Sequence, residues 1–446
     1  MVNSGIPWIG KIPKGWKVSR LKNLATDKDS LIIDGDWIES NVIEASGIRY
    51  LTTGNVGDGV FKEQGQGYIS QETFNTLNCT MVYAGDLVFS RLNYPMGRSC
   101  IIPETYERCV VAVDNVIFRP NKDVSRRYLM YVSMCTGFQN ENALIARGAT
   151  MQRMSRSQLV RVFVPIPDMN VQQRIASFLD RKCAEIDEMI ALQEKIVEEL
   201  KAYKQSVITE AVTKGLNPDV PMKDSGIEWI GKIPEQWRVC RVKDVLELGK
   251  DGIKIGPFGS SLTNKVNGDG ECKIYGQWNI VNKDFTAGKN FVSAETYREL
   301  DAYKIVAGDI LVSMMGTIGK CAIIPNGLQD GIMDSHVIKI RINKSIINPE
   351  YFELMYDKDN STFIFEQLSR MKKGSIMDGL NSSIVKRLYL LLPPIDEQQE
   401  IVSYLLQKRS EIESLISIKQ RKIDDLKEYK KSIIYEYVTG KKEVIE

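Results

Sequence analysis

The sequence predicts a mixed α/β protein that contains one architecture twice, with two α/β globular regions alternating with two long helices. Three observations predict this fold class: an internal duplication, two apolar stripes with the period of a coiled coil, and short β-branched segments bounded by glycine, proline and aspartate. The duplication also predicts a pseudo-twofold relation between the two halves of the chain.

The duplication is visible at both ends of each half. Residues 4–16 are SGIPWIGKIPKGW and residues 225–237 are SGIEWIGKIPEQW. Far downstream, Gln172 opens the segment QQRIASFLDRKCAEID and Gln398 opens QQEIVSYLLQKRSEIE. The offset between the copies is almost the same at both places, and it is far longer than the roughly 20–50 residues of a solenoid repeat. The sequence therefore predicts a duplicated domain pair. Because the paired tryptophans of the opening recur at identical spacing, we expect them to be packing anchors.

The long helices are predicted from a 3.5-residue apolar period without proline or glycine. In 171–214 one set of positions holds Leu179, Ile186, Leu200 and Val207, and the companion set holds Ile175, Met189, Ile196 and Tyr203. In the second half the corresponding sets are Leu405, Ile412, Leu426 and Ile433, and Ile401, Leu415 and Tyr429. We expect Leu179, Ile186, Leu200, Leu405, Ile412 and Leu426 to pack between the helices. At 1.5 Å per residue, such a helix is about 65 Å long.

The rest of each half is predicted to be mixed α/β. The expected strands are Leu87–Ser90, Val110–Val113, Val116–Phe118, Ile310–Ser313 and Val337–Ile342, and AGDL at 84–87 matches AGDI at 307–310. A proline-bearing stretch separates the halves. The predicted borders are a globular region at 1–165, a long helix at 166–214, a linker at 215–224, a second globular region at 225–390 and a second long helix at 391–446.

Composition places the chain among ordinary globular proteins. It has 446 residues, of which 43% are hydrophobic and 26% charged, and a net charge of +2. No apolar run reaches the roughly 20 residues of a membrane span, and the N-terminal segment lacks an apolar signal core. The eight cysteines form no C-x-x-C pair, which argues against a zinc site or a disulfide framework. We expect a cytoplasmic protein without a metal.

Nothing in the sequence supports catalysis. The single histidine, His336, lies in a strand-like run, so no histidine-based catalytic pair can occur twice in the duplicated chain. GTIGK at 316–320 is too short for a phosphate-binding loop. LPPI at 392–395 lacks the polar residue that precedes the prolines in amino-methyltransferases, and it fits better as the stretch before a helix.

Several loops carry the chemistry of DNA contacts. They combine arginine or lysine, suited to phosphates and guanine, with amides suited to adenine, alongside glycine and hydroxyl residues. An ordinary solvated loop is the competing interpretation for each of them. The expected DNA-binding residues are Asn55, Arg91, Asn93, Arg98, Arg147, Lys254, Ser260, Ser261, Lys265, Gln277, Asn279, Lys372 and Lys373.

Taken together, the repeated SGI-x-WIGKIP opening, the run IGPFGSSL at 255–262 and the glutamine-led helices resemble the specificity (S) subunit of type I restriction-modification systems. The resemblance covers essentially the whole chain. It implies that 1–165 and 225–390 are target-recognition domains, each reading half of a split, asymmetric sequence of double-stranded DNA. It also implies that the two helices pack antiparallel as a coiled-coil spacer. A rod of about 65 Å spans roughly two turns of B-DNA at 34–36 Å each.

The resemblance further implies a larger assembly. Such subunits are themselves non-catalytic and dock two methyltransferase (M) subunits, which two restriction (R) subunits join. Adenosylmethionine belongs to the methyltransferase, and ATP and Mg²⁺ to the restriction subunit, so no cofactor is expected here. Three alternatives remain open: a protein-interaction scaffold, a silent copy without a DNA-reading role, and a degenerate nuclease or methylase.

Overall fold

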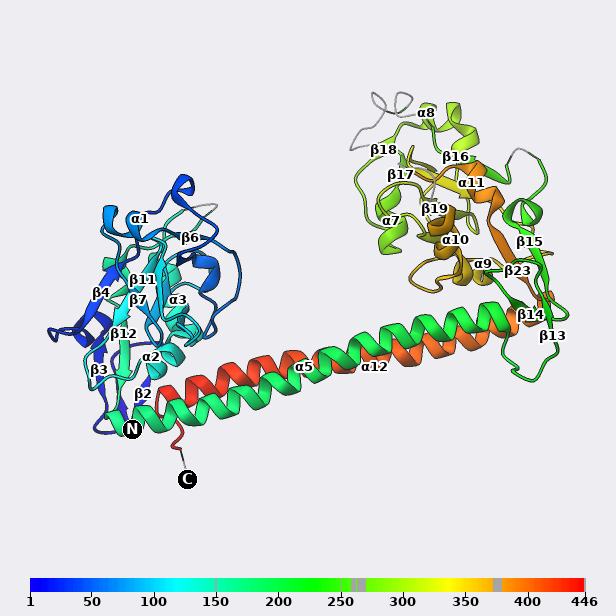
Figure 1. Ribbon diagram of the computed structural model, residues 1–446. Coiled ribbons are helices and arrows are strands. Elements are labelled where there is room, and N and C mark those ends of the chain that lie inside the picture. Colours follow the sequence, from blue (N-terminus) through cyan, green and yellow to red (C-terminus); the bar gives the residue numbers. More distant parts are fainter. Residues whose placement is uncertain (149–150, 250, 258–261, 263–269, 372–378, 445–446) are drawn as a thin grey trace. The chain divides into compact units, whose positions relative to one another are not determined.

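The computed structural model describes residues 1–148, 151–249, 251–257, 262, 270–371 and 379–444 (Figure 1). The chain divides into two compact units, one formed by Met1–Glu194 with Arg421–Glu446 and the other by Lys195–Gln420. Each unit therefore contains a globular part and a stretch of both long helices.

Unit 1 holds two four-stranded sheets. Their strand orders are β4-β11-β8-β9, which is antiparallel throughout, and β6-β5-β10-β7, in which β5 and β10 are parallel. Two strand pairs, β1 with β2 and β3 with β12, complete its β-structure. The strands are β1 (Val2–Asn3), β2 (Lys11–Ile12), β3 (Lys17–Arg20), β4 (Leu31–Asp34), β5 (Ile48–Leu51), β6 (Tyr68–Ile69), β7 (Val82–Tyr83), β8 (Leu87–Ser90), β9 (Ser99–Ile101), β10 (Arg108–Val111), β11 (Asn115–Arg119) and β12 (Phe163–Ile166). The helices are α1 (Gln71–Thr76), α2 (Arg126–Ser133), α3 (Thr136–Ile145), α4 (Arg156–Leu159) and the start of α5 (Met169–Lys214), with short 3₁₀ turns at Leu21–Leu24, Ser40–Val42 and Thr53–Asn55.

Unit 2 repeats this plan. Its sheets have the orders β16-β22-β19-β20 and β18-β17-β21, and β17 and β21 are again parallel. The strands are β13 (Met222–Asp224), β14 (Lys232–Pro234), β15 (Arg238–Arg241), β16 (Ile253–Ile255), β17 (Cys272–Tyr275), β18 (Phe291–Val292), β19 (Ile310–Ser313), β20 (Cys321–Ile323), β21 (Gly331–Met333), β22 (Val337–Ile340) and β23 (Tyr389–Leu392). The helices are α7 (Gln277–Asn282), α8 (Ala294–Glu299), α9 (Pro349–Tyr356), α10 (Phe363–Met371), α11 (Ser382–Arg387) and α12 (Ile395–Val438), with 3₁₀ turns at Val242–Val245 and Asp301–Tyr303. All five expected strands are confirmed, with borders that differ by at most two residues.

The repeated AGD motif is structural in both units. Gly85 and Gly308 have φ angles of 80° and 87°, which a residue without Cβ adopts without strain. The aspartate that follows is buried and accepts a hydrogen bond from the backbone at the start of the turn. Asp86 also pairs with Arg119 of β11, and Asp309 pairs with Arg341 at the end of β22. The motif therefore closes the turn before β8 and β19 and ties it to the neighbouring strand.

The paired glutamines explain how each long helix begins. The Gln172 side chain is fully buried; its amide nitrogen donates to the carbonyls of Pro167 (2.8 Å) and Asp123 (3.1 Å), and its oxygen accepts from the Ser125 amide (2.8 Å). Gln398 makes the same three bonds in unit 2, to Pro393 and Ile346 and from Asn348. The first turns of α5 and α12 are therefore fastened to the loops that precede α2 and α9.

The repeated tryptophans pack as expected. Trp8 meets Phe138 of α3 edge-on, with ring centroids 6.3 Å apart, and Trp229 meets Phe363 of α10 at 5.4 Å. Trp237 is fully buried, and its indole nitrogen donates to Glu397 on the first turn of α12. These contacts fasten the opening segment of each half to its own unit.

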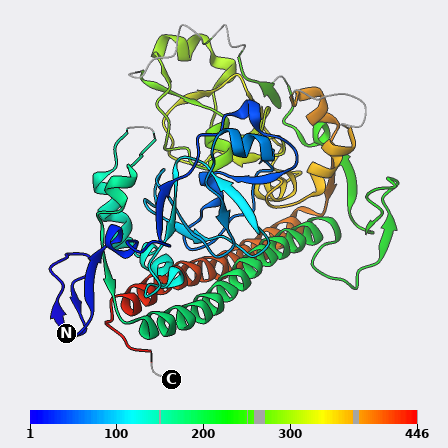
Figure 2. The ribbon, with the colours of Figure 1, turned by 60° about the vertical axis from the view of Figure 1, so that its left-hand side comes forward.

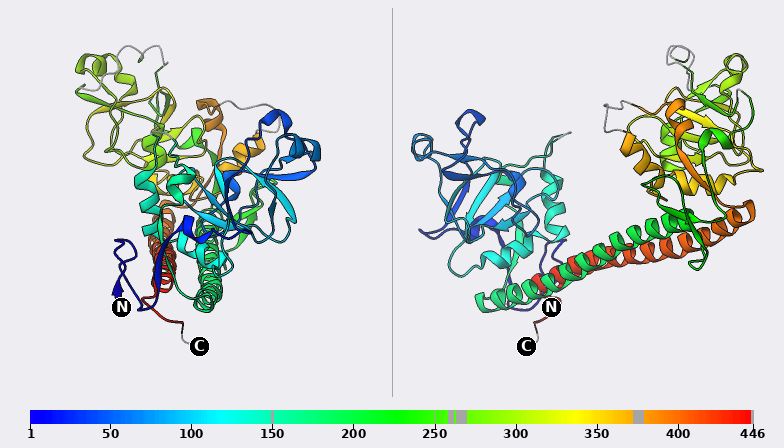
Figure 3. Two further views of the ribbon diagram at one scale, coloured as in Figure 1. Left: turned by 90° about the vertical axis from the view of Figure 1, so that its left-hand side faces the viewer. Right: turned by 45° about the vertical axis from the view of Figure 1, so that its right-hand side comes forward.

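The two long helices run antiparallel within each unit, as expected. In unit 1, Lys430 pairs with Asp187 at 2.7 Å and Lys427 pairs with Glu194 at 3.6 Å. In unit 2, Lys204 pairs with Glu413 at 3.3 Å. From Asp187 to Glu194 the residue numbers rise along α5, while the numbers of the paired lysines on α12 fall from 430 to 427, so the two helices run in opposite directions. The two helices lie side by side in the further views of the ribbon (Figures 2 and 3).

One of the two predicted sets of seam positions is confirmed, and the companion set is confirmed at Ile175 and Ile401 but wrong by one residue farther along the helices. The set expected to pack between the helices is buried or half-buried: Leu179, Ile186, Leu200, Leu405, Ile412 and Leu426. In the companion set, however, Met189, Tyr203, Leu415 and Tyr429 are exposed, and Ile190, Val197 and Ile423 are buried instead. Adjacent residues lie about 100° apart around a helix. Because both neighbours are apolar in pairs such as Met189–Ile190, the pattern could not decide which one faces the partner.

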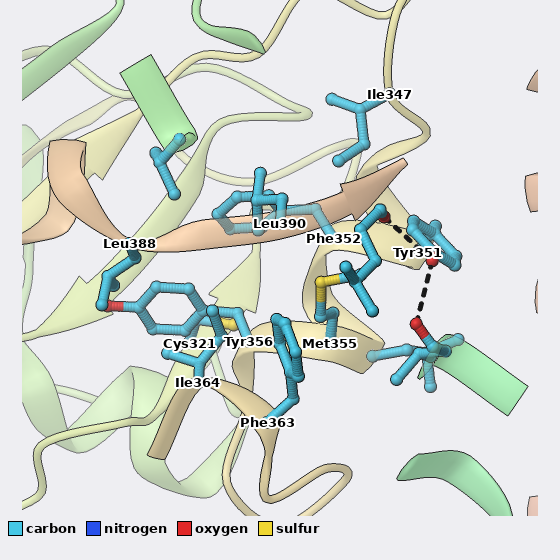
Figure 4. Close-up of a cluster of buried hydrophobic side chains, with 14 of the residues drawn as sticks. Cys321, Ile347, Tyr351, Phe352, Met355, Tyr356, Phe363, Ile364, Leu388 and Leu390 are labelled. Atoms are coloured by element: carbon cyan, nitrogen blue, oxygen red, sulfur yellow. Dashed lines mark hydrogen bonds between the residues drawn. The ribbon is translucent and has the colours of Figure 1, made fainter. Parts of the chain in front are cut away.

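In each unit a buried tyrosine hydroxyl links the end of one long helix to the strand that precedes the other. Tyr128 of α2 is fully buried and contacts two carbonyl oxygens, Pro165 of β12 at 3.0 Å and Val438 at the end of α12 at 2.8 Å. Tyr351 of α9 does the same with Leu391 of β23 at 3.1 Å and Val212 near the end of α5 at 3.2 Å (Figure 4). In unit 2 it stands at the border of an apolar cluster that includes Phe352, Met355, Tyr356 and Leu390.

Substitution of the buried glutamines tests this arrangement. We expect Gln172→Ala and Gln398→Ala each to lower the free energy of unfolding by about 1–3 kcal/mol, because buried backbone groups lose their partner. The measurement is the urea midpoint followed by circular dichroism. Gln173→Ala is the matched control, since that neighbouring side chain is exposed. Midpoints equal to that of the control would contradict the assignment.

Candidate nucleic-acid interface

Three segments of unit 1 meet at one edge of its sheets. The β8–β9 connection carries Arg98, whose guanidinium donates to the carbonyls of Val56 (2.7 Å), Leu92 (2.6 Å) and Thr53 (3.1 Å). Arg98 therefore joins its own loop to the turn that follows β5. Burial lowers its pKa. Because its donors are used by backbone carbonyls, this expected DNA-binding residue holds two loops together instead.

The third segment, described at residues 147–148 and 151–154, is joined to the β8–β9 loop through the backbone of Gln152 and Met154. The amide of Asn93 donates to Gln152 at 2.9 Å, and that of Met154 donates to Arg91 at 3.1 Å. The backbones of Arg147 and Arg153 form an antiparallel bridge with two hydrogen bonds, of 2.9 and 2.8 Å. The fold therefore gathers Asn55, Arg91, Asn93, Arg98 and Arg147 in one region of unit 1. Of these five, Asn93 and Arg147 are exposed.

Arg91 is an internal charge, which corrects the expectation that it contacts DNA. It is 5% exposed; its Nε lies 3.2 Å from Asp34, and Nη2 lies 3.7 Å from Asp114. Burial lowers the pKa of Arg91, and the two carboxylates oppose that shift. The same carboxylates also hold Arg153 (2.6 Å) and Arg156 (3.5 Å), which lie nearer the surface. The buried group therefore supports the cationic segment beside it.

The cationic segment 147–161 was not predicted as a whole from the sequence. It contains Arg147, Arg153, Arg156 and Arg161 and no acidic residue. The Arg153 and Arg156 side chains keep 50% and 41% of their surface exposed despite their ion pairs, and Arg161 is exposed. The signal available in the sequence was this run of arginines without acids, next to the single residue Arg147 that we did select.

Unit 2 builds the same edge with different residues. The side-chain oxygen of Gln277 accepts three hydrogen bonds from the end of β19 and the loop after it: from the Ser313 hydroxyl (2.8 Å), the Met314 amide (3.0 Å) and the Met315 amide (2.8 Å). The Leu380 amide donates to Met314, as Met154 donates to Arg91 in unit 1. The oxygen of Gln277, another expected DNA contact, is therefore occupied inside the unit.

Asn55 and Asn279 correct the expectation in the same way. They are 1% and 4% exposed, and both close a turn after the parallel strand of their sheet. Each side chain accepts from one backbone amide and donates to two carbonyls. A buried amide with all of these partners is a structural group. The alignment of the two asparagines across the halves is real, and its reason is folding.

The remaining expected residues fall into two classes. Lys254 is half-buried on β16, with its amine 5.1 Å from the centre of the Tyr303 ring. Outside the described residues lie Ser260, Ser261, Lys265, Lys372 and Lys373.

We also searched the described residues for metal ligands, for partners of the histidine and for membrane-spanning helices. There, no three His, Cys, Asp or Glu side chains cluster as metal ligands. The Nδ1 atom of His336 lies 3.0 Å from the hydroxyl oxygen of its neighbour Ser335. No helix in the described part of the chain is long and apolar enough to cross a membrane.

Comparisons with known proteins agree with this architecture. A family model described as the type I restriction modification DNA specificity domain matches twice, at residues 13–202 and 234–428. The chain is 24% identical over 440 residues to the putative type I restriction enzyme MjaX specificity subunit of Methanocaldococcus jannaschii, covering 97% of this chain and 95% of that protein. It is 21% identical to the EcoKI specificity subunit of Escherichia coli K12, covering 88% and 82%.

Solved structures show the same fold. A chain from a structural study of complex assembly and conformational transition in the type I R-M system superimposes with a TM-score of 0.70 at 15% identity, covering 96% of this chain and 98% of that one. The HsdS subunit from Thermoanaerobacter tengcongensis gives a TM-score of 0.54 at 16% identity with the same coverage.

The contrast between Arg91 and Arg147 is testable without a ligand. We expect Arg91→Met to lower the free energy of unfolding by about 1–3 kcal/mol, because the carbonyls of Met154 and Val113 lose their donor and the half-buried Asp34 and Asp114 each lose one cation. Arg147→Ala, at an exposed side chain, should change it by less than about 0.5 kcal/mol. Urea unfolding of the two variants checks this. Equal stability of both would show that Arg91 is not a structural charge.

Proposed function

Because the chain belongs to the type I restriction-modification DNA specificity family, we propose that it is the non-catalytic subunit that chooses the DNA sequence for such a complex. The observation that carries the proposal is the duplication of one scaffold with two different sets of surface loops. Two different half-sites of a split, asymmetric DNA sequence require this combination. We propose that 1–165 and 225–390 are the two target-recognition domains.

The cationic segment 147–161 supports a nucleic-acid partner. Arg153 and Arg156 pair with the half-buried Asp114 and Asp34, and the backbone of Arg147 pairs with that of Arg153, so these residues are held in place before DNA arrives. Arginine is suited to phosphates and to guanine edges. We assign Arg147, Arg153, Arg156 and Arg161 to contact the DNA backbone, together with Asn93 on the adjoining loop. In unit 2 the corresponding segment leads into α11, where Lys386 and Arg387 are exposed.

The partners follow from the family. Curated relatives are named as subunits of type I restriction enzymes, and one structural neighbour comes from a study of complex assembly. We propose that the paired helices dock two methyltransferase subunits, that two restriction subunits join them in the cytoplasm, and that cofactors bind to those subunits. Exposed apolar residues on the helices, such as Leu192, Tyr203, Leu406 and Leu415, are available for such docking.

Base-resolved methylation mapping tests the proposal. Host DNA is compared with and without this gene in the presence of its methyltransferase subunits. We expect a split motif, modified on both strands, that appears only with the gene and loses its first half when 1–165 is exchanged. Unchanged methylation while the complex still assembles would favour a protein scaffold or a silent copy.

The salt dependence of DNA binding tests the cationic segment. Each arginine that neutralises a phosphate contributes about one unit to the slope of log affinity against log salt. We therefore expect Arg147→Ala and Arg161→Ala to weaken binding to all sequences alike and to lower that slope. Lys195→Ala, on the exposed surface of α5, is a control. Slopes equal to that of the intact protein would remove the segment from the interface.

The spacer role of the helices is tested by lengthening them. Seven residues inserted between Ile190 and Val197 of α5, with a matched seven between Ile416 and Ile423 of α12, preserve the buried seam. Seven residues add about 10 Å of helix, or about three base pairs at 3.4 Å each. We expect the gap between the half-sites to lengthen accordingly in the methylation map. A motif with an unchanged gap would refute the helices as the ruler.

A further inference from the structure

The two units share one internal frame at the turn after the parallel strand. In unit 1 the side chain of Asn55 accepts from the Thr52 amide (2.8 Å) and donates to the carbonyls of Lys62 (2.9 Å) and Gln64 (2.8 Å). In unit 2 Asn279 accepts from Gly276 (2.9 Å) and donates to Asp284 (2.8 Å) and Ala287 (3.0 Å). Each asparagine thus binds a turn to the loop that follows it.

In each unit a buried cationic side chain also donates to backbone carbonyls of the loop that the asparagine binds. Arg49 of β5, 5% exposed, donates to the carbonyls of Gln64 (2.9 Å), Gly65 (2.6 Å) and Gly67 (2.8 Å). At the matching position of β17, Lys273 is 4% exposed and donates to Phe285 (3.0 Å) and Thr286 (2.7 Å). Burial lowers the pKa of Lys273. Carbonyls of both loops accept from these cations, so the backbone of each loop is fixed from inside the unit.

The side chains displayed on this common frame differ. The residue before Asn55 is Gly54, and a Cβ added there would collide with the amide nitrogen of Gln64. The Gln64 side chain therefore lies across Gly54. In unit 2 the residue before Asn279 is Trp278, which is 55% exposed. At the position before the framing asparagine, unit 1 therefore has a glycine covered by the Gln64 amide, and unit 2 has an exposed indole.

The surroundings in unit 1 suit a partner with polar edges. A cleft of about 500 Å³ opens beside Gln64, lined by residues that include Arg49, Tyr50, Thr52 and Gln66. The Gln64 side chain is at the surface, whereas its backbone is held by Arg49 and Asn55. A side chain on a rigid backbone loses less conformational freedom on binding than one on a mobile loop.

We propose that this position determines specificity in each recognition domain, with Gln64 contacting a base of the first half-site and Trp278 a base of the second. The inference rests on the proposed DNA-reading function and names the residues that perform it. A glutamine amide can bond both N6 and N7 of adenine. An exposed indole offers a flat apolar face to a thymine methyl group or to a base step. The shared frame supplies position, and the exposed side chain supplies the choice of base.

The test uses the intact chain in complex with its methyltransferase subunits. A pool of duplex oligonucleotides randomised over the two half-sites is selected on the complex and sequenced. We expect Gln64→Ala to relax one or two positions of the first half-site only, and Trp278→Ala to relax the second half-site only. Discrimination at those positions should fall about 10- to 100-fold, the range that one base contact of 1–3 kcal/mol gives.

The matched control is Val306→Ala, which removes an exposed apolar side chain from the turn that precedes β19. Gln277, the neighbour of Trp278, contacts the other end of that strand, at Ser313. Thermal unfolding checks that all variants fold, and Trp278→Phe keeps a flat ring if Trp278→Ala is unstable. Because neither residue is assigned to a phosphate, the salt dependence of binding should not change.

The outcomes separate the two levels of the proposal. If the unaltered chain selects no split motif, the DNA-reading function itself fails. If it does select one, but both variants retain the same motif, or weaken all sequences uniformly, only the assignment of Gln64 and Trp278 is overturned. Relaxation confined to the expected half-site supports both.

Discussion

In each unit a buried tyrosine hydroxyl joins the last turn of one long helix to the strand that leads into the other. Tyr128 holds Val438 and Pro165, and Tyr351 holds Val212 and Leu391. Each globular part is therefore completed by a helix end from the opposite half of the sequence. Loss of that hydroxyl would remove the link between helix end and strand and take a donor away from buried carbonyl oxygens, which is costly. The duplicated halves consequently form one interdependent molecule, although each has its own sheets.

The surface chemistry depends on polar groups that are not at the surface. Arg98 and Gln277 join neighbouring loops, Asn55 and Asn279 close the same turn, and Arg91 balances two carboxylates beneath exposed arginines. Loops without regular secondary structure have backbone carbonyls and amides that must still be satisfied. Side chains meet that need here, so the loops have a defined shape before any partner binds. A common frame with exchangeable outward residues is a physical basis for two specificities on one fold.

Much of this architecture could be predicted from the sequence, but the candidate contacts could not be sorted. The five strands, the two long helices and their seam leucines were accessible, because apolar period is a local property. The expected DNA contacts were chosen by chemical type. Arginine and asparagine bond equally well to a nucleic acid and to a backbone carbonyl, so type alone did not reveal that Arg91 and Asn55 are internal. The arginines of 147–161 were overlooked because their importance lies in their grouping.

By itself the sequence determined the duplication, the mixed α/β class, the long helices and the family resemblance, since repeats and periodicity survive without coordinates. Tertiary structure decided which face of each helix is buried, where a choice between Met189 and Ile190 depends on the partner helix. It also decided which polar residues are free to contact a ligand. Gln64 lies across Gly54 only because Arg49 and Asn55 hold its backbone there. Such placement depends on contacts between segments far apart in the fold, which no local pattern encodes.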